Sequence, residues 1–196
     1  MRVPSMPLLA RLRANISGTT VVEFAFALPV LLAMYLGGYV LADESSASRK
    51  VTITARAITD LTTRYGALTT TQLNTIMAAS AQILVPYNGA NAKQRVSEVL
   101  VTGATTATVV WSQVPTGQTG MTALPACTVV TLNANMAATG SYVILGEVGY
   151  AYTPLVGLGS GHNTNFYDRY FMIPRLVSAI APPDGSTPTT CPATSS

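Results

Sequence analysis

Charged residues are scarce in this sequence. Asp, Glu, Lys and Arg together make up 10% of its 196 residues, against roughly 25% in soluble domains. Hydrophobic residues make up 48%, and the mean hydropathy is +0.36. Such a chain can bury enough apolar surface to fold, which argues against disorder. The composition also argues against an ordinary cytosolic protein and leaves membrane-linked or exported classes.

Residue types that catalyse reactions or bind metals are also few. His162 is the single histidine, and no partner stands at metal-ligand spacing from it. Glu98, Glu147 and Asp168 lie on separate predicted segments, so nothing pairs them for acid–base chemistry. The glycines within 157–161 lack the helix and the acidic residue of a dinucleotide-binding fingerprint, and they indicate a flexible loop. We therefore predict no enzyme activity, no catalytic residues, no metal site and no cofactor.

Basic residues are too few for a nucleic-acid interface. The formal net charge is +3, from 11 basic and eight acidic residues, and these do not form a basic face. The whole excess lies in the first 18 residues, which hold Arg2, Arg11 and Arg13 and no acid. Residues 19–196 are balanced, with eight groups of each sign. The charge therefore indicates membrane topology, and no nucleic-acid partner is expected.

One long apolar segment is present. Residues 24–42 are nineteen positions without a charge, enough for a helix to span a bilayer. Basic residues precede this segment, and Asp43 and Glu44 follow it directly. By the positive-inside rule, the N-terminus is expected in the cytoplasm and the chain after the span outside.

Glu23 stands at the front of the apolar segment. An ionised carboxylate costs roughly 2.5 to 3.5 kcal/mol at the bilayer centre and less near its edge, so such a group is usually paired or functional. If the chain is cut after Gly18, Thr19 becomes its first residue and Glu23 its fifth. Two plainer interpretations stay open. Glu23 could belong to an ordinary signal anchor, or a secretory signal peptide could end before Asp43.

The string G-TTVVEFAFALPVLL, with Pro29 inside the helix, carries a family resemblance. Its basic leader, glycine and fifth-position glutamate resemble the class III signal sequence of type IV pilin-like proteins. The full string is most similar to the TadE/TadG family of minor pilins or pseudopilins from tight-adherence (Tad, Flp-type) pilus systems. The resemblance covers about residues 11–65, and the strings at 146–155 and 171–175 add weaker likeness.

This resemblance implies a processing site, a set of partners and a location. A prepilin peptidase would cut between Gly18 and Thr19, and the small Gly18 lets the backbone enter a tight site. Glu23 would then neutralise the new amine of Thr19, within the subunit or from a neighbour. The other implied partners are pilin and pseudopilin subunits, the inner-membrane assembly platform and the lipid bilayer. The protein would cross the inner membrane once, with its C-terminal domain in the periplasm or on a surface pilus.

The apolar helix is predicted to continue past the membrane, from Thr19 to Tyr65, and to end at Gly66. Pro29 removes one backbone hydrogen bond and is expected to kink the helix nearby. Apolar residues then recur three and four apart on one face, at Ala47, Val51, Ala55, Ile58, Leu61 and Tyr65. Arg56, Asp60 and Arg64 stand four apart on another face and are expected to pair weakly.

The remaining chain predicts one more helix and a sheet. Thr69 to Gln72 reads as a capping box that opens a helix to Leu84, closed by Pro86. Segments rich in Val, Thr and aromatic residues predict strands at 95–103, 107–114, 127–133, 141–153 and 169–180. In the fourth strand Tyr142, Ile144, Val148, Tyr150 and Tyr152 alternate onto one face, with Gly146 at the remaining position. Pro174 places the last strand at a sheet edge, and Trp111 is expected in the core.

The predicted fold is therefore α+β and pilin-like: a long transmembrane helix that continues as an amphipathic helix, a short helix, and a C-terminal antiparallel sheet. The segments are a leader at 1–18, a membrane helix at 19–42, its amphipathic extension at 43–66, an exported domain at 67–181 and a Pro/Thr/Ser-rich tail at 182–196.

Cys127 and Cys191 are the only cysteines. In an exported domain they are expected to form a disulfide that ties the tail to the body, with two free thiols as the alternative. The preferred function is a minor pilin or pseudopilin that takes part in assembly or tip formation of an adhesive pilus. The second hypothesis is a membrane-anchored exported binding or adhesion domain without a pilus role. An exported hydrolase has little support, because no nucleophile stands with a base.

Overall fold

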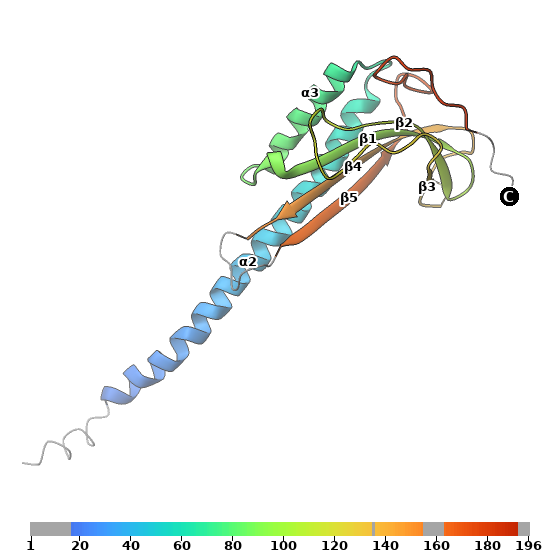
Figure 1. The fold of residues 1–196 in the computed structure, drawn as a ribbon. Coiled ribbons are helices and arrows are strands. Elements are labelled where there is room, and N and C mark those ends of the chain that lie inside the picture. The colour runs from blue at the N-terminus through green and yellow to red at the C-terminus, as the bar shows by residue number, and fades with distance from the viewer. Residues whose placement is uncertain (1–16, 135, 155–162, 192–196) are drawn as a thin grey trace, which may run out of the picture.

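The fold is organised around one long helix. The computed structural model describes residues 17–134, 136–154 and 163–191. Helix α2 (Ser17–Thr63) has 47 residues and is unbroken through Pro29. Its N-terminal part projects as a rod from a globular head (Figure 1). The predicted helix from Thr19 to Tyr65 is confirmed over the described residues, and it ends at Thr63, two residues earlier than expected.

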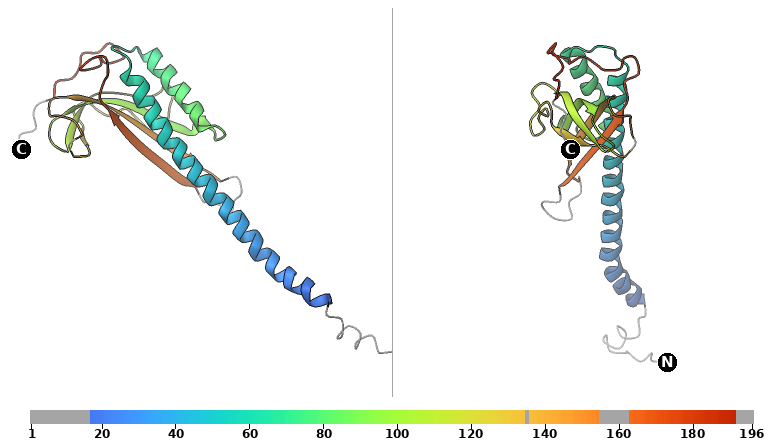
Figure 2. Two further views of the ribbon diagram at one scale, coloured as in Figure 1. Left: turned by 180° about the vertical axis from the view of Figure 1, so that it is seen from behind. Right: turned by 90° about the vertical axis from the view of Figure 1, so that its right-hand side faces the viewer.

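The two halves of α2 have different surroundings. Large apolar side chains between Val21 and Leu41 are exposed, whereas Ala47, Val51, Ala55 and Ile58 are buried. The face predicted from the spacing is confirmed, although Leu61 is only partly buried and Tyr65 is exposed. Figure 2 shows this second half lying along the sheet.

Four threonines of α2 are buried beside this apolar face: Thr54, Thr59, Thr62 and Thr63. The spacing did not predict them. Each hydroxyl donates to a carbonyl oxygen of the preceding turn, as when Thr59 Oγ1 donates to Ala55 O at 2.6 Å. A threonine whose hydroxyl bonds its own helix can be buried without leaving a polar group unsatisfied, so it serves as a small core residue.

The end of α2 differs from the expected glycine cap. Gly66 does not have the positive φ that a left-handed cap requires. The Thr63 carbonyl oxygen instead accepts a hydrogen bond of 3.0 Å from the Arg175 backbone N–H. The helix end is therefore satisfied by a segment more than a hundred residues away in the chain, which local sequence rules cannot foresee.

The second helix agrees with its predicted capping box. Helix α3 (Thr70–Ala81) begins after Thr69, whose Oγ1 accepts from Gln72 N at 3.2 Å while Thr69 N donates to Gln72 Oε1 at 2.9 Å. Two short 3-10 helices follow, η1 (Gln82–Leu84) and η2 (Gly89–Asn91). The buried residues of α3 are Leu73, Ile76, Met77 and Ser80. Their spacing of three, one and three positions places them on one face of the helix.

The sheet is antiparallel throughout and has the order β3-β2-β1-β4-β5. Its strands are β1 (Ala92–Val101), β2 (Thr106–Gln113), β3 (Val129–Thr131), β4 (Tyr142–Tyr152) and β5 (Thr164–Met172). The α+β class is confirmed, and the sheet packs on one side against α2 and α3 (Figure 2).

The last predicted strand was wrong in its position. It was expected at 169–180, but β5 ends at Met172, two residues before Pro174. The edge location is correct, because β5 pairs only with β4 in this sheet. Residues 173–180 instead cross the end of the sheet, where Arg175 N bonds α2 and Ile180 N bonds Glu98. Their apolar residues resembled a strand, but Arg175 N donates to a helix carbonyl and Ile180 N to a side-chain carboxylate instead of to the backbone of a neighbouring strand.

The face of β4 that was predicted to be apolar does lie against α2. Ile144, Val148, Tyr150 and Tyr152 belong to the core cluster that includes the buried face of the helix. Gly146 lies directly beneath α2, where an added Cβ would overlap Thr59 Oγ1 and stand 3.1 Å from the Ala55 carbonyl oxygen. The absence of a side chain at this position lets helix and sheet approach closely.

A second core covers the opposite face of the sheet and was not predicted. It contains seven buried apolar residues: Val99, Val101, Ala107, Val109, Leu132, Val143 and Leu145. Trp111 belongs to the helix-side core, as expected. Two cores explain why strands β1 and β4 are buried on both faces.

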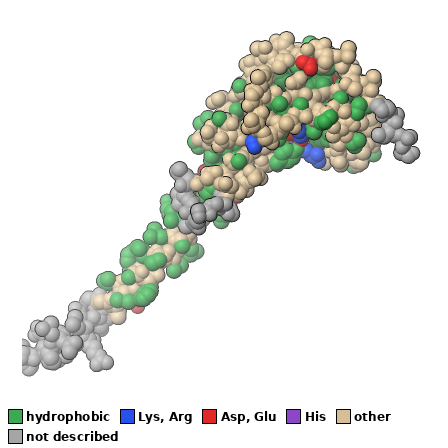
Figure 3. All heavy atoms as spheres, in the orientation of Figure 1, with side chains coloured by type: hydrophobic (Ala, Val, Ile, Leu, Met, Phe, Trp, Pro, Cys, Tyr) green, Lys and Arg blue, Asp and Glu red, His purple; other side chains and the backbone are tan. Residues whose placement is uncertain are grey.

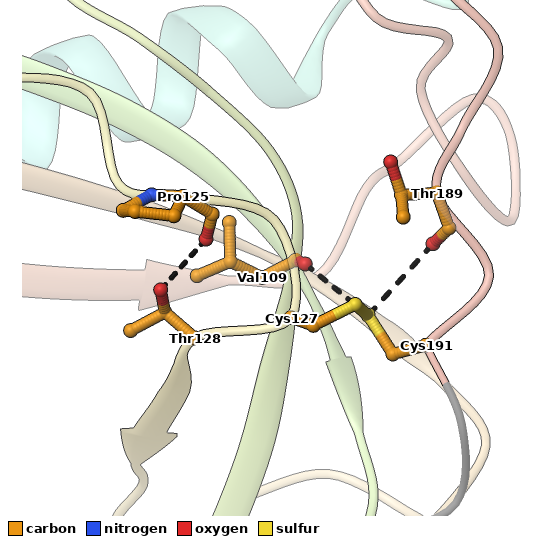
Figure 4. The surroundings of a disulfide bond; sticks show 6 residues. All are labelled: Val109, Pro125, Cys127, Thr128, Thr189 and Cys191. Atoms are coloured by element: carbon orange, nitrogen blue, oxygen red, sulfur yellow. Dashed lines mark hydrogen bonds between the residues drawn. A yellow bond between two sulfur atoms is a disulfide. The ribbon is translucent and has the colours of Figure 1, made fainter.

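The predicted disulfide between Cys127 and Cys191 is present (Figure 4). The two Cα atoms are 5.3 Å apart, and the residues are separated by 64 positions. Cys127 has a φ of 66° and therefore cannot continue a strand, so β3 is shorter than the predicted 127–133. Cys127 N donates to Val109 O at 2.8 Å, which fixes the bridge to β2.

Candidate functional site

The residues of the expected processing site lie at the start of α2. Gly18 is exposed, and an added Cβ would meet no atom within 4 Å. Thr19 and Glu23 are four positions apart in the same helix, so they lie one turn apart on one face. An amine created at Thr19 would therefore be close to the Glu23 carboxylate. Residues 1–16 of the expected leader lie outside the described part of the chain.

The apolar part of α2 has a surface suited to lipid or to other apolar helices. Among the described residues, α2 is the one helix long and apolar enough to cross a membrane, with a mean hydropathy of 2.0 over its most apolar 18 residues. None of that window is buried against the rest of the chain. Phe24, Phe26 and Tyr35 are 60%, 77% and 72% exposed. Figure 3 shows hydrophobic side chains along this rod, and an apolar surface of this extent indicates a membrane or partner contact.

The two acidic residues after the apolar segment join the helix to the sheet. Asp43 accepts hydrogen bonds from the Tyr87 hydroxyl at 2.7 Å and from the Tyr152 hydroxyl. Glu44 accepts from Thr164 Oγ1 at 2.6 Å. Tyr87 also donates to the Asp43 carbonyl oxygen at 2.9 Å. We call these five residues the junction cluster. It holds the base of the globular head to α2 where the apolar segment ends.

Burial and the carboxylate shape the chemistry of the junction cluster. Burial, together with the hydrogen bond to Asp43, raises the pKa of both Tyr87 and Tyr152, so both hydroxyls remain protonated donors at neutral pH. The sequence presented Asp43 and Glu44 only as a topology signal. The sequence contained one hint of this contact. Tyr152 alternates onto the apolar face of its strand near the strand's end, and a buried tyrosine hydroxyl usually finds a hydrogen-bond partner.

The predicted charge row on α2 is present only in part. Asp60 pairs with Arg64, and it also accepts from Arg175 at 2.5 Å, which ties the helix to the segment after β5. Arg56 does not join this pair. Its guanidinium lies 4.9 Å from the ring centroid of Tyr170 on β5, a cation–π contact. Arg56 therefore contacts the sheet, whereas Asp60 contacts the segment after β5 through Arg175.

The three acidic residues considered as catalytic candidates stay apart. Glu98 and Glu147 are buried on opposite faces of the sheet, in β1 and β4. Glu147 pairs with Arg95 at 2.6 Å and accepts from the Tyr167 hydroxyl, whose pKa burial raises to about 12. Asp168 accepts from Thr52 Oγ1 of α2. Each carboxylate therefore has a structural partner, and no two of them face one substrate position.

Glu98 anchors the segment that follows β5. It is 1% exposed, and it accepts from Ile180 N at 2.6 Å and from Trp111 Nε1 at 3.0 Å. Burial raises the pKa of Glu98 from its ordinary value of 4.5 to about 7, although both hydrogen bonds act to lower it. In the folded protein, the Glu98 side chain therefore keeps its proton up to a higher pH than an exposed glutamate does.

This raised pKa predicts a pH dependence of stability. Folded Glu98 binds a proton more readily than unfolded Glu98, so the free energy of unfolding is expected to rise as the pH falls from about 7 to about 4.5. Urea unfolding midpoints of the wild type and of Glu98→Gln, measured across this range, test the effect. The difference between the two proteins should change with pH inside the range and level off outside it. Parallel curves for the two proteins would contradict the assignment.

Groups of metal-ligating side chains were looked for in the described residues. Over 17–134, 136–154 and 163–191, no three His, Cys, Asp or Glu side chains are grouped to hold a metal ion. His162 and the glycines at 157–161 lie outside these ranges. The candidate site is therefore the exposed part of α2, from Gly18 to its junction cluster.

Comparisons of the chain with protein-family models, with curated proteins and with solved structures found no match.

Proposed function

We propose that the protein is a TadE-like minor pilin or pseudopilin that takes part in assembly or tip formation of a Tad (Flp-type) pilus, and that it is not an enzyme. The observation that carries the proposal is the register at the start of α2. A basic leader ends in Gly18, and Glu23 follows as the fifth residue after the proposed cut, at the front of an apolar segment of nineteen residues.

The shape of the molecule supports this role. The apolar part of α2 projects from the head with its side chains exposed, so it can first lie in the bilayer and then pack beside other helices. The junction cluster and the buried second half of α2 join this rod firmly to the head. A pull on the helix would therefore move the globular domain with it, as filament assembly requires.

Glu23 has a defined task in this proposal. Cutting before Thr19 creates an ammonium group one helical turn from the Glu23 carboxylate. In surroundings of low dielectric, each charge alone would be costly, and the pair is tolerated because the two charges offset each other. Glu23 of a neighbouring subunit could instead pair with this amine. The relative position of the two subunits would then depend on the cut that creates the amine.

The proposed partners and location follow from this role. The leader would meet a prepilin peptidase on the cytoplasmic side, while the head would face the periplasm. The apolar helix would contact the inner-membrane lipid, the assembly platform and the other pilin and pseudopilin subunits.

The N-terminal mass of the membrane-extracted protein tests the proposal. In cells that contain a prepilin peptidase, we expect a chain that begins at Thr19. Gly18→Trp should abolish the cut, because a bulky residue cannot enter the tight site before the scissile bond. Gly38→Trp is the matched control, since Gly38 is likewise an exposed glycine of α2 with open space around it.

Three results would contradict this processing. A chain that keeps Met1 would favour a plain membrane-anchored binding or adhesion domain, and a chain that starts at Asp43 would indicate a secretory signal peptide. Normal cutting of Gly18→Trp would remove the assigned site. Separately, Glu23→Ala should be cut normally yet assemble poorly, and unchanged pilus numbers would remove the charge-pairing role of Glu23.

A further inference from the structure

A cleft of about 630 Å³ lies on the head, between α3, the start of β1 and the loop at 115–119. One wall is α3, which contributes Asn74 and Ala78, and the other is the loop at 115–119. Gln94 and its neighbours at the start of β1 also line the cleft. The volume lies within the range of small-ligand sites, which is roughly 300 to 1,000 Å³.

The loop wall is held in place by side-chain amides. Asn74 Nδ2 donates to Thr116 Oγ1 at 2.9 Å, and Thr116 N donates back to Asn74 Oδ1 at 3.3 Å. Gln118 Oε1 accepts from Gln94 N at 2.6 Å, while Gln118 Nε2 donates to Gln94 O at 3.0 Å. The Gln118 amide thus takes the place of a neighbouring strand beside β1, beyond the end of β2. These paired bonds keep the cleft open and preformed.

One lining residue has an unused hydrogen-bonding atom. Gln94 is 3% exposed, and its Oε1 accepts no hydrogen bond from any residue that the structure describes. Gln94 stands opposite Val148 in the sheet, so its side chain lies on the face that packs against the helices. A buried acceptor without a donor costs about 1 to 3 kcal/mol. The atom itself has almost no accessible surface, so a ligand in the cleft would reach it once the Gln94 side chain turns toward the cleft. A hydrogen bond donated by that ligand would recover this free energy.

The other lining groups indicate the class of ligand. The polar lining residues are carboxamides and hydroxyls apart from Lys93, which is the one ionisable lining residue, and Met77 is the one large apolar side chain. Small residues such as Gly89, Ala90 and Gly117 supply much of the remaining wall. This lining suits neither an apolar ligand nor a strongly charged one. It suits a neutral molecule whose groups both donate and accept hydrogen bonds, which describes a sugar.

We propose that this cleft binds a short neutral saccharide. The hydroxyls of the sugar would donate to Gln94 Oε1 and exchange hydrogen bonds with the amides of the two walls. No aromatic ring lines the cleft among the described residues, so the affinity is expected to be weak. The inference does not depend on the pilin role, because a saccharide site would serve an exported adhesion domain equally well.

Ligand-observed saturation-transfer NMR on the full chain in detergent tests the proposal. The probes are maltose, cellobiose and diacetylchitobiose, with an alanine-rich tripeptide and a digalacturonate as probes of other classes. At least one neutral disaccharide should give a signal, and the tripeptide and digalacturonate should give none.

Two exposed alanines of α3 provide matched variants. Ala78 lines the cleft and Ala79 does not, so Ala78→Phe should fill the site and reduce the signal at least tenfold, while Ala79→Phe leaves it unchanged. Gln94→Leu should also reduce binding at least tenfold, whereas Gln113→Leu, on β2 outside the cleft, should not. Thermal melting of each variant confirms that it is folded.

The outcomes are decisive in both directions. Loss of the signal in Ala78→Phe and Gln94→Leu, with folding retained, supports the proposal. If Gln94→Leu does not fold, the pair of alanine variants decides alone. The proposal fails if no disaccharide binds the wild type, if Ala78→Phe binds as well as Ala79→Phe, or if only the tripeptide or the digalacturonate binds. None of these results bears on cleavage at Gly18, so the two proposals stand or fall separately.

Discussion

Replacing Cys127 and Cys191 with serine is expected to lower the free energy of unfolding by about 4 kcal/mol. The bridge closes a loop of 64 positions, and in the chain-entropy model such a crosslink removes about this much conformational entropy from the unfolded chain. The tail would lose its covalent tie to Cys127 in the segment before β3, while Glu98 and the end of α2 would still bind the segment before the tail. Denaturant unfolding of the detergent-solubilised protein measures the change.

The single variants serve as the controls for this experiment. Either one breaks the same bond, so both should match the double variant, and reductant should bring the wild type to the same midpoint. Cys127→Gly should be milder than Cys127→Ser, because Cys127 has a φ of 66°, a conformation that glycine adopts without cost. A loss below about 1 kcal/mol would mean that the noncovalent anchors of the tail carry its stability.

Gly146→Ala is expected to lower the free energy of unfolding by about 3 kcal/mol, the upper part of the usual range for overpacking a core. The new methyl group would overlap Thr59 Oγ1 and press against the Ala55 carbonyl oxygen and Ile58. Because two of these neighbours belong to the helix backbone or its core face, α2 must move away from β4. Thermal and urea unfolding of the variant measure the cost.

Gly149→Ala provides the matched control on the same strand. Gly149 points to the other face of the sheet, where an added Cβ would stand 3.4 Å from Met121 Cε, an ordinary contact with a flexible side chain. This substitution should change stability by less than about 1 kcal/mol. Adding Thr59→Ala to Gly146→Ala should recover part of the loss, since it removes one of the overlaps. Equal effects at Gly146 and Gly149 would show that close packing on α2 is not the cause.

Features that depend on residues close together in the sequence were predictable from the sequence. The buried face of α2, the capping box of α3 and the apolar face of β4 all follow from the spacing of residues within one element. The wrong prediction at 169–180 has the opposite origin. Its apolar and aromatic residues suit a strand, but Arg175 N and Ile180 N bond groups on α2 and β1. Local pattern does not reveal partners that lie 80 or more residues away.

The candidate site divides in the same way. Gly18, Thr19, Glu23 and the apolar span are contiguous, so their register can be read directly from the chain. The junction cluster could not be predicted, because it joins Asp43 and Glu44 to Tyr87, Tyr152 and Thr164 from three distant segments. Arg56 was expected to pair along its own helix, yet the approach of β5 offered it the ring of Tyr170.

By itself, the sequence determined that one apolar helix follows a basic N-terminal segment, that the chain after Gly18 has balanced charge, and that two cysteines were available to close a loop. These properties depend on composition and on spacing along the chain. Only the tertiary structure decided that Gly146 lies under Thr59, that Glu98 is buried against Ile180, and that Gln94 lines a cleft with an unused acceptor. Those properties arise where separate elements meet. The free energy of each contact depends on groups that are far apart in the sequence, so the sequence pattern around one residue does not show its partner.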